Sequence, residues 1–170
     1  MKFSIGQNVA VAPDAAVAAY ADPAFYENQT SSGDITLVEV VSHEDEGDQA
    51  RIEVRYQFTG NVSSAVRAVI DPAKMSWITR TDIDKAGRRT SFTVLPDHYP
   101  DRLDCSGTFT FAQGSPAAPG SAGTETTVVT IAGDLTVHVF LVAKTVEQLI
   151  VNGLRTYLEA EVATLPDFTR

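Results

Sequence analysis

The sequence predicts a single α+β domain in which a curved antiparallel sheet wraps around one long C-terminal helix. Apolar side chains recur with the period of an amphipathic helix over residues 142–165. Before this helix, residues 35–141 consist mainly of segments in which apolar and polar side chains alternate, as they do in half-buried strands. A chain of 170 residues suits one domain that buries a core and still encloses some space. We therefore expect one domain over residues 1–170.

The first strand is expected over residues 3–11, and two short helices should follow it. Pro13 ends this strand, because proline cannot donate to the hydrogen-bond ladder. Pro13–Asp14 and Asp22–Pro23 each favour the start of a helix, since Pro and Asp are common in the first turn. The face of the strand that we expect to be buried carries Phe3, Ile5, Val9 and Val11.

The next segment predicts a hairpin followed by a short helical stretch. Apolar and polar side chains alternate in Ile35–Val41 and Ala50–Thr59, on either side of an acidic tip at residues 44–48. A glycine then interrupts the alternation, and apolar residues recur at helical spacing within residues 62–70. We interpret this stretch as a short amphipathic helix or turn.

Four further strands complete an expected total of seven. The last strand should run from Val129 to Leu141, with Gly133 at a bulge or bend that lets it curve. Residues 114–123, rich in Gly, Ser and Pro, should form an exposed connection. The other three strands are expected at Met75–Ile83, Thr90–Leu95 and Arg102–Phe111.

This order of elements, with a glycine in the middle of the buried face of the last helix, resembles the helix-grip fold of the START-like (SRPBCC) superfamily. The birch-pollen allergen, lipid-transfer domains and aromatase/cyclase domains belong to it. Within the superfamily the sequence is most similar to an uncharacterised bacterial family, through residues 133–142 leading into 144–147 and the terminal helix. The resemblance covers the whole chain and implies a seven-stranded curved antiparallel sheet around the helix. Phe140 stands where that pattern has a proline, so we expect a different strand exit.

Composition argues against several classes of partner. The formal charge is -9, from 13 Lys and Arg against 22 Asp and Glu, so phosphate backbones and anionic lipid surfaces repel the protein on average. No long uncharged apolar segment is present, and the first residues alternate instead of forming the core of a signal peptide. A single cysteine, Cys105, cannot form an intramolecular disulfide. We therefore expect a cytoplasmic protein without nucleic-acid binding or membrane insertion, and nothing in the sequence specifies its oligomeric state.

No motif for a metal, a cofactor or nucleophilic catalysis is present. His43, His98 and His138 lie far apart, without Cys, His or carboxylate partners at metal-ligand spacing. Cys105 shares an apolar strand face, where a neutral thiol behaves as a small hydrophobe, and no histidine accompanies it. The sequence therefore predicts no metal, no cofactor and no identifiable catalytic residue, and His138 should lie on the outer face of the last strand.

Two carboxylates and one loop are the remaining candidates for acid–base chemistry. Glu147 and Glu161 fall at the edge of the apolar arc of the terminal helix. An inward carboxylate would be a polar anchor in an apolar cavity or, paired with His98 or Tyr99, an acid–base pair. We favour a simpler interpretation, in which both carboxylates extend to water and the loop Pro96–Asp101 is a turn.

Large side chains on the inward faces define the expected ligand site. A curved sheet around one helix encloses more volume than one helical stripe fills, so we expect a cavity for a small hydrophobic molecule or lipid. The alternatives are an enzyme of the cyclase or dehydratase type and a protein-interaction module with a filled core. The predicted ligand-contacting residues are Tyr56, Phe58, Val66, Ile70, Met75, Trp77, Phe92, Tyr99, Phe109, Phe111, Val146, Ile150, Gly153 and Tyr157.

The expected topology also predicts where the cavity opens. Successive connections of an antiparallel meander alternate between the two ends of the sheet. Residues 62–70, 96–101 and 142–145 should therefore meet at one end, and residues 114–123 should lie at the other. We expect the first group to surround the mouth, with residues 62–70 as a small lid and Tyr99 opposite.

Overall fold

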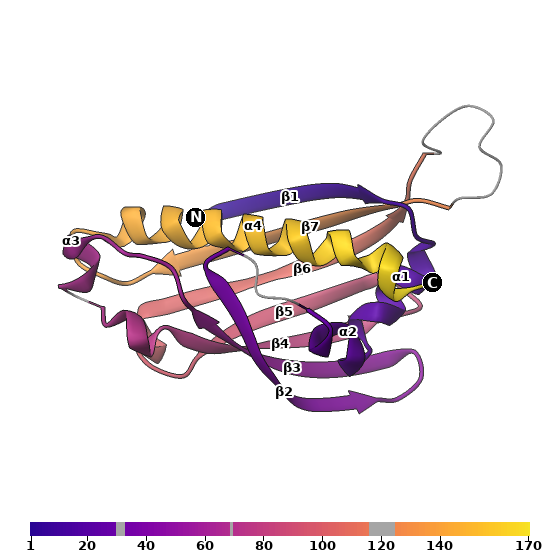
Figure 1. Cartoon of the computed structure of the whole chain (residues 1–170), viewed down its shortest axis with the longest axis horizontal. Helices are drawn as coiled ribbons and strands as arrows, with labels where there is room; N and C mark the ends of the chain where they lie inside the picture. The colour runs from indigo at the N-terminus through magenta and orange to yellow at the C-terminus, as the bar shows by residue number, and fades with distance from the viewer. Residues whose placement is uncertain (30–32, 69, 116–124) are drawn as a thin grey trace.

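The computed structural model describes residues 1–29, 33–68, 70–115 and 125–170 and has the predicted α+β fold (Figure 1). Within these residues, seven antiparallel strands form one curved sheet, and the long helix α4 lies along one of its faces. Single 3-10 turns, η1 and η2, cover Pro72–Lys74 and Pro100–Arg102. The other elements are β1 (Lys2–Val9), α1 (Pro13–Tyr20), α2 (Pro23–Glu27), β2 (Ile35–Asp45), β3 (Gln49–Phe58), α3 (Ser64–Arg67), β4 (Ser76–Asp84), β5 (Arg89–Pro96), β6 (Leu103–Gln113), β7 (Thr127–Val137) and α4 (Ala143–Phe168).

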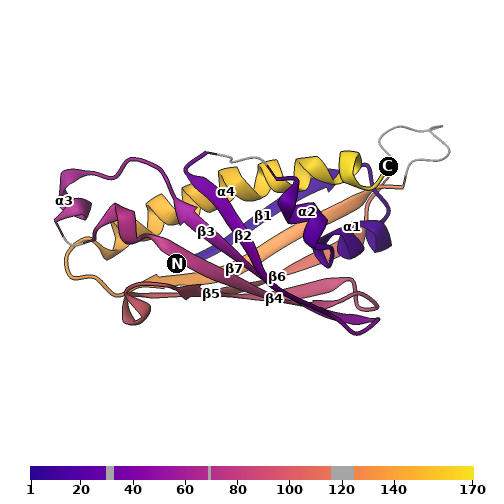
Figure 2. The same ribbon diagram turned by 60° about the horizontal axis from the view of Figure 1, so that its bottom comes forward.

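The first strand pairs with the last one, which makes β1 and β2 the two edges of the sheet. The strand order is β1-β7-β6-β5-β4-β3-β2. Because β1 and β2 are consecutive in the chain, α1 and α2 carry the chain from one edge to the other (Figures 1 and 2). Asp22 begins α2, and its Oδ1 accepts a hydrogen bond from Ala24 N at 2.9 Å. The two predicted helices are thus confirmed, and they cover one end of the face that α4 occupies.

The irregular strand is the edge strand β2, not β7. Two register shifts interrupt the pairing of β2 with β3, and shifts of this kind bend and twist a strand. The bulge or bend expected at Gly133 is absent, because Gly133 pairs in continuous register with Phe3 and Gly107. A Cβ atom on Gly133 would lie 2.6 Å from the Phe3 ring. Glycine at this position therefore leaves room for that ring.

The last strand is shorter than predicted and ends at Val137 instead of Leu141. Its neighbour β6 begins at Leu103, which pairs with Val137, so the ladder between the two strands ends there with one last backbone hydrogen bond from His138 N to Arg102 O. Phe140 and Leu141 then leave the sheet with 86% and 88% of their surface exposed, and Leu141 has a φ of 68°. Leu141 is therefore not part of the inward row that the alternation predicts.

Helix α4 packs unevenly along its length. Leu149, Ile150 and Gly153, which the period places on the buried face, are only half-buried. The first half of α4 therefore stands over space, and its second half is the part that packs tightly. The fully buried side chains of the helix are Val146, Val151, Tyr157, Leu158, Glu161, Val162 and Leu165.

An aromatic cluster joins α1 and α2 to the sheet and to the end of α4. The ring of Tyr20 lies 5.1 Å from that of Phe25, 5.2 Å from Phe109 and 5.3 Å from Phe111, measured between centroids. Phe25 in turn lies 5.3 Å from Phe168 in the last turn of α4. Each such pair contributes about 0.5–1.5 kcal/mol beyond the area that it buries. This end of the molecule is therefore well packed.

The connections lie at the two ends of the sheet as predicted. Those that follow β3, β5 and β7 lie at the end that carries α3, and the ends of β6 and α4 lie at the other (Figures 1 and 2). Val69 of the expected lid and residues 116–123 of the expected linker lie outside the described residues. In the part of the chain that is described, no helix is long and apolar enough to span a membrane.

Replacing Leu165 with alanine should lower the free energy of unfolding by about 2–5 kcal/mol, because this side chain is fully buried in the tightly packed half of α4. The matched control Leu141→Ala, at a side chain that is 88% exposed, should change it by less than about 0.5 kcal/mol. Urea denaturation of both variants measures the difference. Equal losses would show that the second half of α4 is not the anchored part.

Candidate functional site

A cavity of about 110 Å³, the outer cavity, lies beneath the first half of α4. Leu149, Ile150 and Gly153 of α4 line it on one side, and Trp77 and Leu135 of the sheet line it on the other. The mouth residues of η1 and η2 contribute to the same lining. The half-burial of α4 in this region is thus explained by the space below it.

A second cavity of about 60 Å³, the inner cavity, lies beneath the middle and second half of α4. The two cavities adjoin, because both are lined by Ile35, Trp77, Val94, Cys105 and Leu154. Side chains of α1 and α2 line only the inner one. Together the two cavities form a row that runs from the mouth toward α1, and their walls are mainly apolar.

Most of the predicted ligand-contacting residues line one of these cavities. Val66 and Phe111 line neither, since both are buried in the core and Phe111 packs against Tyr20. The predicted residues that line the outer cavity are Phe58, Ile70, Met75, Trp77, Tyr99, Val146, Ile150 and Gly153. Those that line the inner cavity are Tyr56, Trp77, Phe92, Phe109 and Tyr157.

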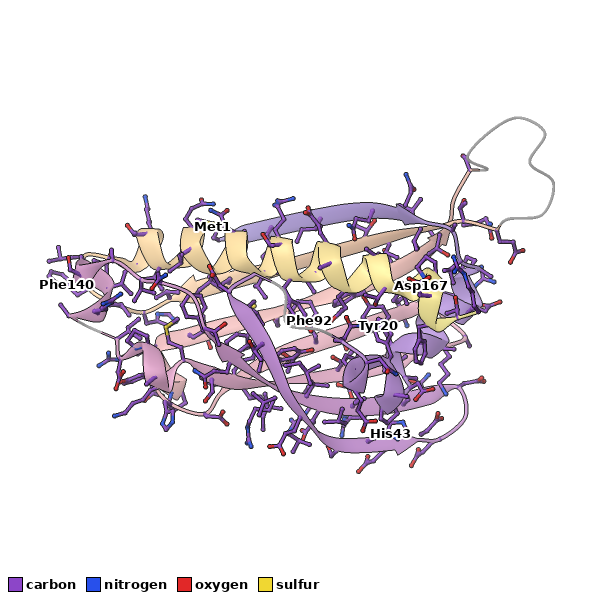
Figure 3. All side chains as sticks on the ribbon, viewed as in Figure 1. Met1, Tyr20, His43, Phe92, Phe140 and Asp167 are labelled. Carbon is purple, nitrogen blue, oxygen red and sulfur yellow. The ribbon has the colours of Figure 1, made fainter. Side chains whose placement is uncertain are left out.

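Sequence reasoning missed the contribution of the two short helices. Tyr20 of α1 and Tyr26 of α2 both line the inner cavity. Phe92 of β5 lines the same cavity, and Figure 3 labels Tyr20 and Phe92 next to each other, below α4 in that view. The sequence does carry a signal for this contribution, which lies in its composition. Residues 13–29 are rich in alanine, and their only aromatic residues are Tyr20, Phe25 and Tyr26.

Glu161 is the only buried carboxylate among the described residues, with 4% of its surface exposed. It lines the inner cavity, so the expectation that it extends to water is wrong. Burial raises the pKa of Glu161 to about 7, and the neighbouring hydroxyls of Tyr20 and Tyr157 oppose that rise. At neutral pH this carboxyl group is therefore divided between its protonated and ionised forms.

The tyrosines around Glu161 are themselves incompletely hydrogen-bonded. Tyr26 donates a hydrogen bond from its hydroxyl to Tyr20 O at 3.1 Å. The hydroxyls of Tyr20 and Tyr157 are buried, and neither makes a hydrogen bond of ordinary geometry in the described part of the chain, although both lie near enough to the Glu161 carboxyl to lower its pKa. Burial raises the pKa of both phenols, and the Glu161 charge raises it further, so both stay protonated and able to donate.

Glu147, unlike Glu161, makes contacts that stabilise the fold. Its Oε1 accepts a hydrogen bond from Val137 N at 3.0 Å, and its Oε2 lies 4.0 Å from the N-terminal amine of Met1. Glu147 lines neither cavity. It therefore secures the exit of β7 and the start of α4 and has no place in a ligand site.

The loop after β5 lies at the mouth of the outer cavity. His98 is exposed and Tyr99 half-buried, and both line that cavity. Tyr99 has a left-handed backbone conformation, and the Arg102 guanidinium lies 4.9 Å from the centre of its ring. Glu161 lines only the inner cavity. The acid–base pair sketched for Glu161 with His98 or Tyr99 is therefore not assembled in this structure.

The other titratable candidates have ordinary structural explanations. Burial raises the pKa of the Cys105 thiol to about 12, so it is a neutral part of the cavity wall. His138 is exposed as predicted but lies one residue beyond the end of β7, with Nε2 2.7 Å from Asp104 Oδ2. Among the residues that the structure describes, no group of three or more His, Cys, Asp or Glu side chains could hold a metal ion.

Comparison with solved structures places the fold in a known class. The crystal structure of TTHA0849 from Thermus thermophilus has a TM-score of 0.64 and 15% identity, with 100% of both chains covered. The Zhui aromatase/cyclase from Streptomyces sp. R1128 has a TM-score of 0.62 and 12% identity, covering 100% of this chain and 96% of that one. Norcoclaurine synthase from Thalictrum flavum, in complex with dopamine and hydroxybenzaldehyde, has a TM-score of 0.58 and 14% identity. The match covers 100% of this chain and 88% of that one.

At these identities the likeness shows the fold alone, and that fold is the helix-grip fold. The chain belongs to the family described as "Protein of unknown function (DUF2505)", which it matches over residues 5–168. A sequence comparison with curated proteins found no match. The helix-grip fold and the membership of an uncharacterised family, both expected from the sequence, are thus confirmed.

Replacing Gly153 with alanine should raise the free energy of unfolding by up to about 1 kcal/mol, because alanine has the higher helix propensity. A Cβ atom there would meet nothing within 4 Å, since Gly153 faces the outer cavity. The control Gly107→Ala should be destabilising, because its Cβ would lie 2.3 Å from Ala132 O. Thermal or urea unfolding measures both, and a clear loss of stability in Gly153→Ala would contradict the open space.

The stability of the protein should fall between about pH 5 and pH 8 because of Glu161. Its pKa is about 7 in the folded chain against an ordinary 4.5, so the folded state holds more protons than the unfolded state in this window. Stability is therefore lost as the pH rises, by about 3 kcal/mol in total. Glu161→Gln cannot ionise and should lack this part of the decline.

Urea unfolding at pH 5 and pH 8 tests this pH dependence. Other titrating groups contribute equally to wild type and variant, so the difference between them isolates Glu161. Glu159→Gln, on the same helix with a side chain 46% exposed, should follow wild type. Parallel pH profiles for wild type and Glu161→Gln would show that the buried carboxyl has an ordinary pKa.

Proposed function

We propose that this START-like domain binds a small hydrophobic or amphipathic molecule between the sheet and α4. The observation that carries the proposal is the row of two adjoining cavities, of about 110 and 60 Å³, whose walls are mainly apolar. Pockets of this chemistry favour an apolar body with few polar groups, because desolvation of the walls drives binding. The ligand-contacting residues are those that line the two cavities, including Trp77 and Cys105 of their shared wall.

The named structural neighbours support a small organic ligand. One is an aromatase/cyclase, and another is a norcoclaurine synthase in complex with dopamine and hydroxybenzaldehyde. The shared fold does not transfer their activities, because one fold serves many functions. It does make a ligand of aromatic or lipid-like character, held under the long helix, the most economical hypothesis for this chain.

Access to the site is proposed at the α3 end of the molecule. Ile70 and Lys74 follow α3 and line the outer cavity, and Tyr99 lines it from the loop after β5. Val66 is fully buried and attaches the four-residue helix α3 to the core. A short segment with few buried side chains opens at lower free energy than α4 does, so residues 62–68 suit the role of a lid.

Binding is favoured over cyclase-like catalysis. Acid–base catalysis of a cyclisation needs a donor and an acceptor that both reach the substrate. His98 and Glu161 line different cavities, and burial keeps Cys105 protonated. A buried free cysteine and the acidic charge of the chain fit a cytoplasmic binding protein that avoids nucleic acid.

Native mass spectrometry of the protein as purified from cells tests the proposal first, since a co-purified apolar molecule would appear as a discrete mass increase. Titration with the apolar fluorophore Nile red tests it next. Gly153→Leu should weaken dye binding at least several-fold, because the new side chain projects into the outer cavity.

A matched control separates filling of the cavity from a general effect of the leucine. Gly6 is an exposed glycine of β1, and a Cβ atom there would also meet nothing within 4 Å. Gly6→Leu should bind the dye like wild type. If folded Gly153→Leu also bound it like wild type, the dye would lie outside this cavity and the proposed site would be wrong.

A further inference from the structure

The inner cavity brings one carboxyl group and four phenols together with no cation facing them. Glu161 and Tyr157 come from α4, Tyr20 from α1, Tyr26 from α2 and Tyr56 from β3. Four elements therefore converge here, so the cluster does not follow from the pattern of a single helix face. In the described part of the chain, no Lys, Arg or His side chain lines this cavity.

The remaining walls of the inner cavity are uncharged. Strand β4 contributes Thr79 and Thr81, β6 contributes the protonated Cys105, and β1 contributes Phe3. Glu161 is thus the one group in this lining that gains a charge near neutral pH. Its ionised form would be a buried charge that faces the hydroxyls of Tyr20 and Tyr157 but no cation in this lining, which is unfavourable.

Two of the phenols are not fully hydrogen-bonded. The hydroxyls of Tyr20 and Tyr157 are buried and make no hydrogen bond of ordinary geometry among the described residues, although both lie near enough to Glu161 to lower its pKa. Tyr56 and Tyr157 meet edge to face with their centroids 5.4 Å apart, and both line the same cavity as the carboxyl group of Glu161. Anionic oxygen beside tyrosine rings is the combination that recognises an ammonium group.

We propose that the inner cavity binds the protonated amine of an apolar ligand, with the ammonium on the Glu161 carboxylate and among the rings of Tyr20, Tyr56 and Tyr157. This assignment rests on the proposed function, because the apolar body of the ligand would fill the outer cavity. A ligand hydroxyl would satisfy hydrogen bonds but would leave the carboxylate without a countercharge. Selectivity for an amine over the matching alcohol therefore defines the site.

The test compares n-octylamine with 1-octanol, which share an apolar chain and differ in the polar end. Isothermal titration calorimetry at pH 6, 7 and 8 gives both dissociation constants. The pKa of Glu161 is about 7, so its ionised fraction rises about tenfold from pH 6 to pH 8. The affinity ratio of amine to alcohol should rise by about the same factor in the wild type.

Glu161→Gln should remove this pH dependence, so that its affinity ratio of amine to alcohol stays constant from pH 6 to pH 8, since the amide cannot ionise. Glu159→Gln, an exposed carboxylate on the same helix, should keep the wild-type ratio. If Glu161→Gln fails to fold, the wild-type pH profile still decides, together with the NMR titration of the Glu161 carboxyl carbon. Bound amine should lower that pKa, and bound alcohol should not.

Each outcome separates this inference from the proposed function. Binding of 1-octanol with an amine ratio that stays constant from pH 6 to pH 8 would overturn the amine site and leave the apolar cavity as the ligand site. Absence of binding by both probes would overturn the two proposals together. A rising ratio that persists in Glu161→Gln would assign the pH effect to another group and would also overturn the amine site.

Discussion

The structure depends on how one helix covers a sheet of seven strands. An α-helix with its side chains is about 10–12 Å across, and neighbouring strands lie about 4.7–4.9 Å apart, so α4 cannot cover the sheet alone. The curvature of the sheet and the aromatic residues of α1 and α2 reduce the uncovered surface at one end. The space beneath Ile150 and Gly153 is what remains. The cavity is therefore a consequence of the architecture, and its chemistry is set by the residues that happen to face it.

The parts of the fold that follow from local patterns could be predicted from the sequence. Alternation and helical period placed all seven strands, both short helices and α4, because each pattern reports which side of its own element is buried. The end of β7 could not be predicted, since it depends on where β6 begins at Leu103. The polar lining of the inner cavity could not be predicted from the sequence either. Whether Glu161 faces inward depends on the rotation of α4, and its neighbour Tyr20 comes from a segment far away in the sequence.

Glu161 lies in the half of α4 that holds the fold together, between Leu158 and Val162, which are both buried. Its ionisation opposes folding by about 3 kcal/mol at high pH, against a total stability of about 5–15 kcal/mol for a typical domain. An apolar residue of similar volume would avoid this loss. A purely structural account of Glu161 is thus unfavourable, whereas a ligand cation would recover the energy by pairing with the carboxylate.

The order of the two cavities also constrains how a ligand with a polar end would bind. The polar cluster lies at the inner end, and the outer cavity between it and the mouth is lined by side chains such as Ile150 and Leu135. An ammonium group would cross this apolar section without its hydration shell, which raises the barrier in both directions. Opening of the proposed lid would lower that barrier if it admitted water to the outer cavity. If both proposals hold, ligand exchange would therefore be slow, and the ligand's affinity would depend on Glu161.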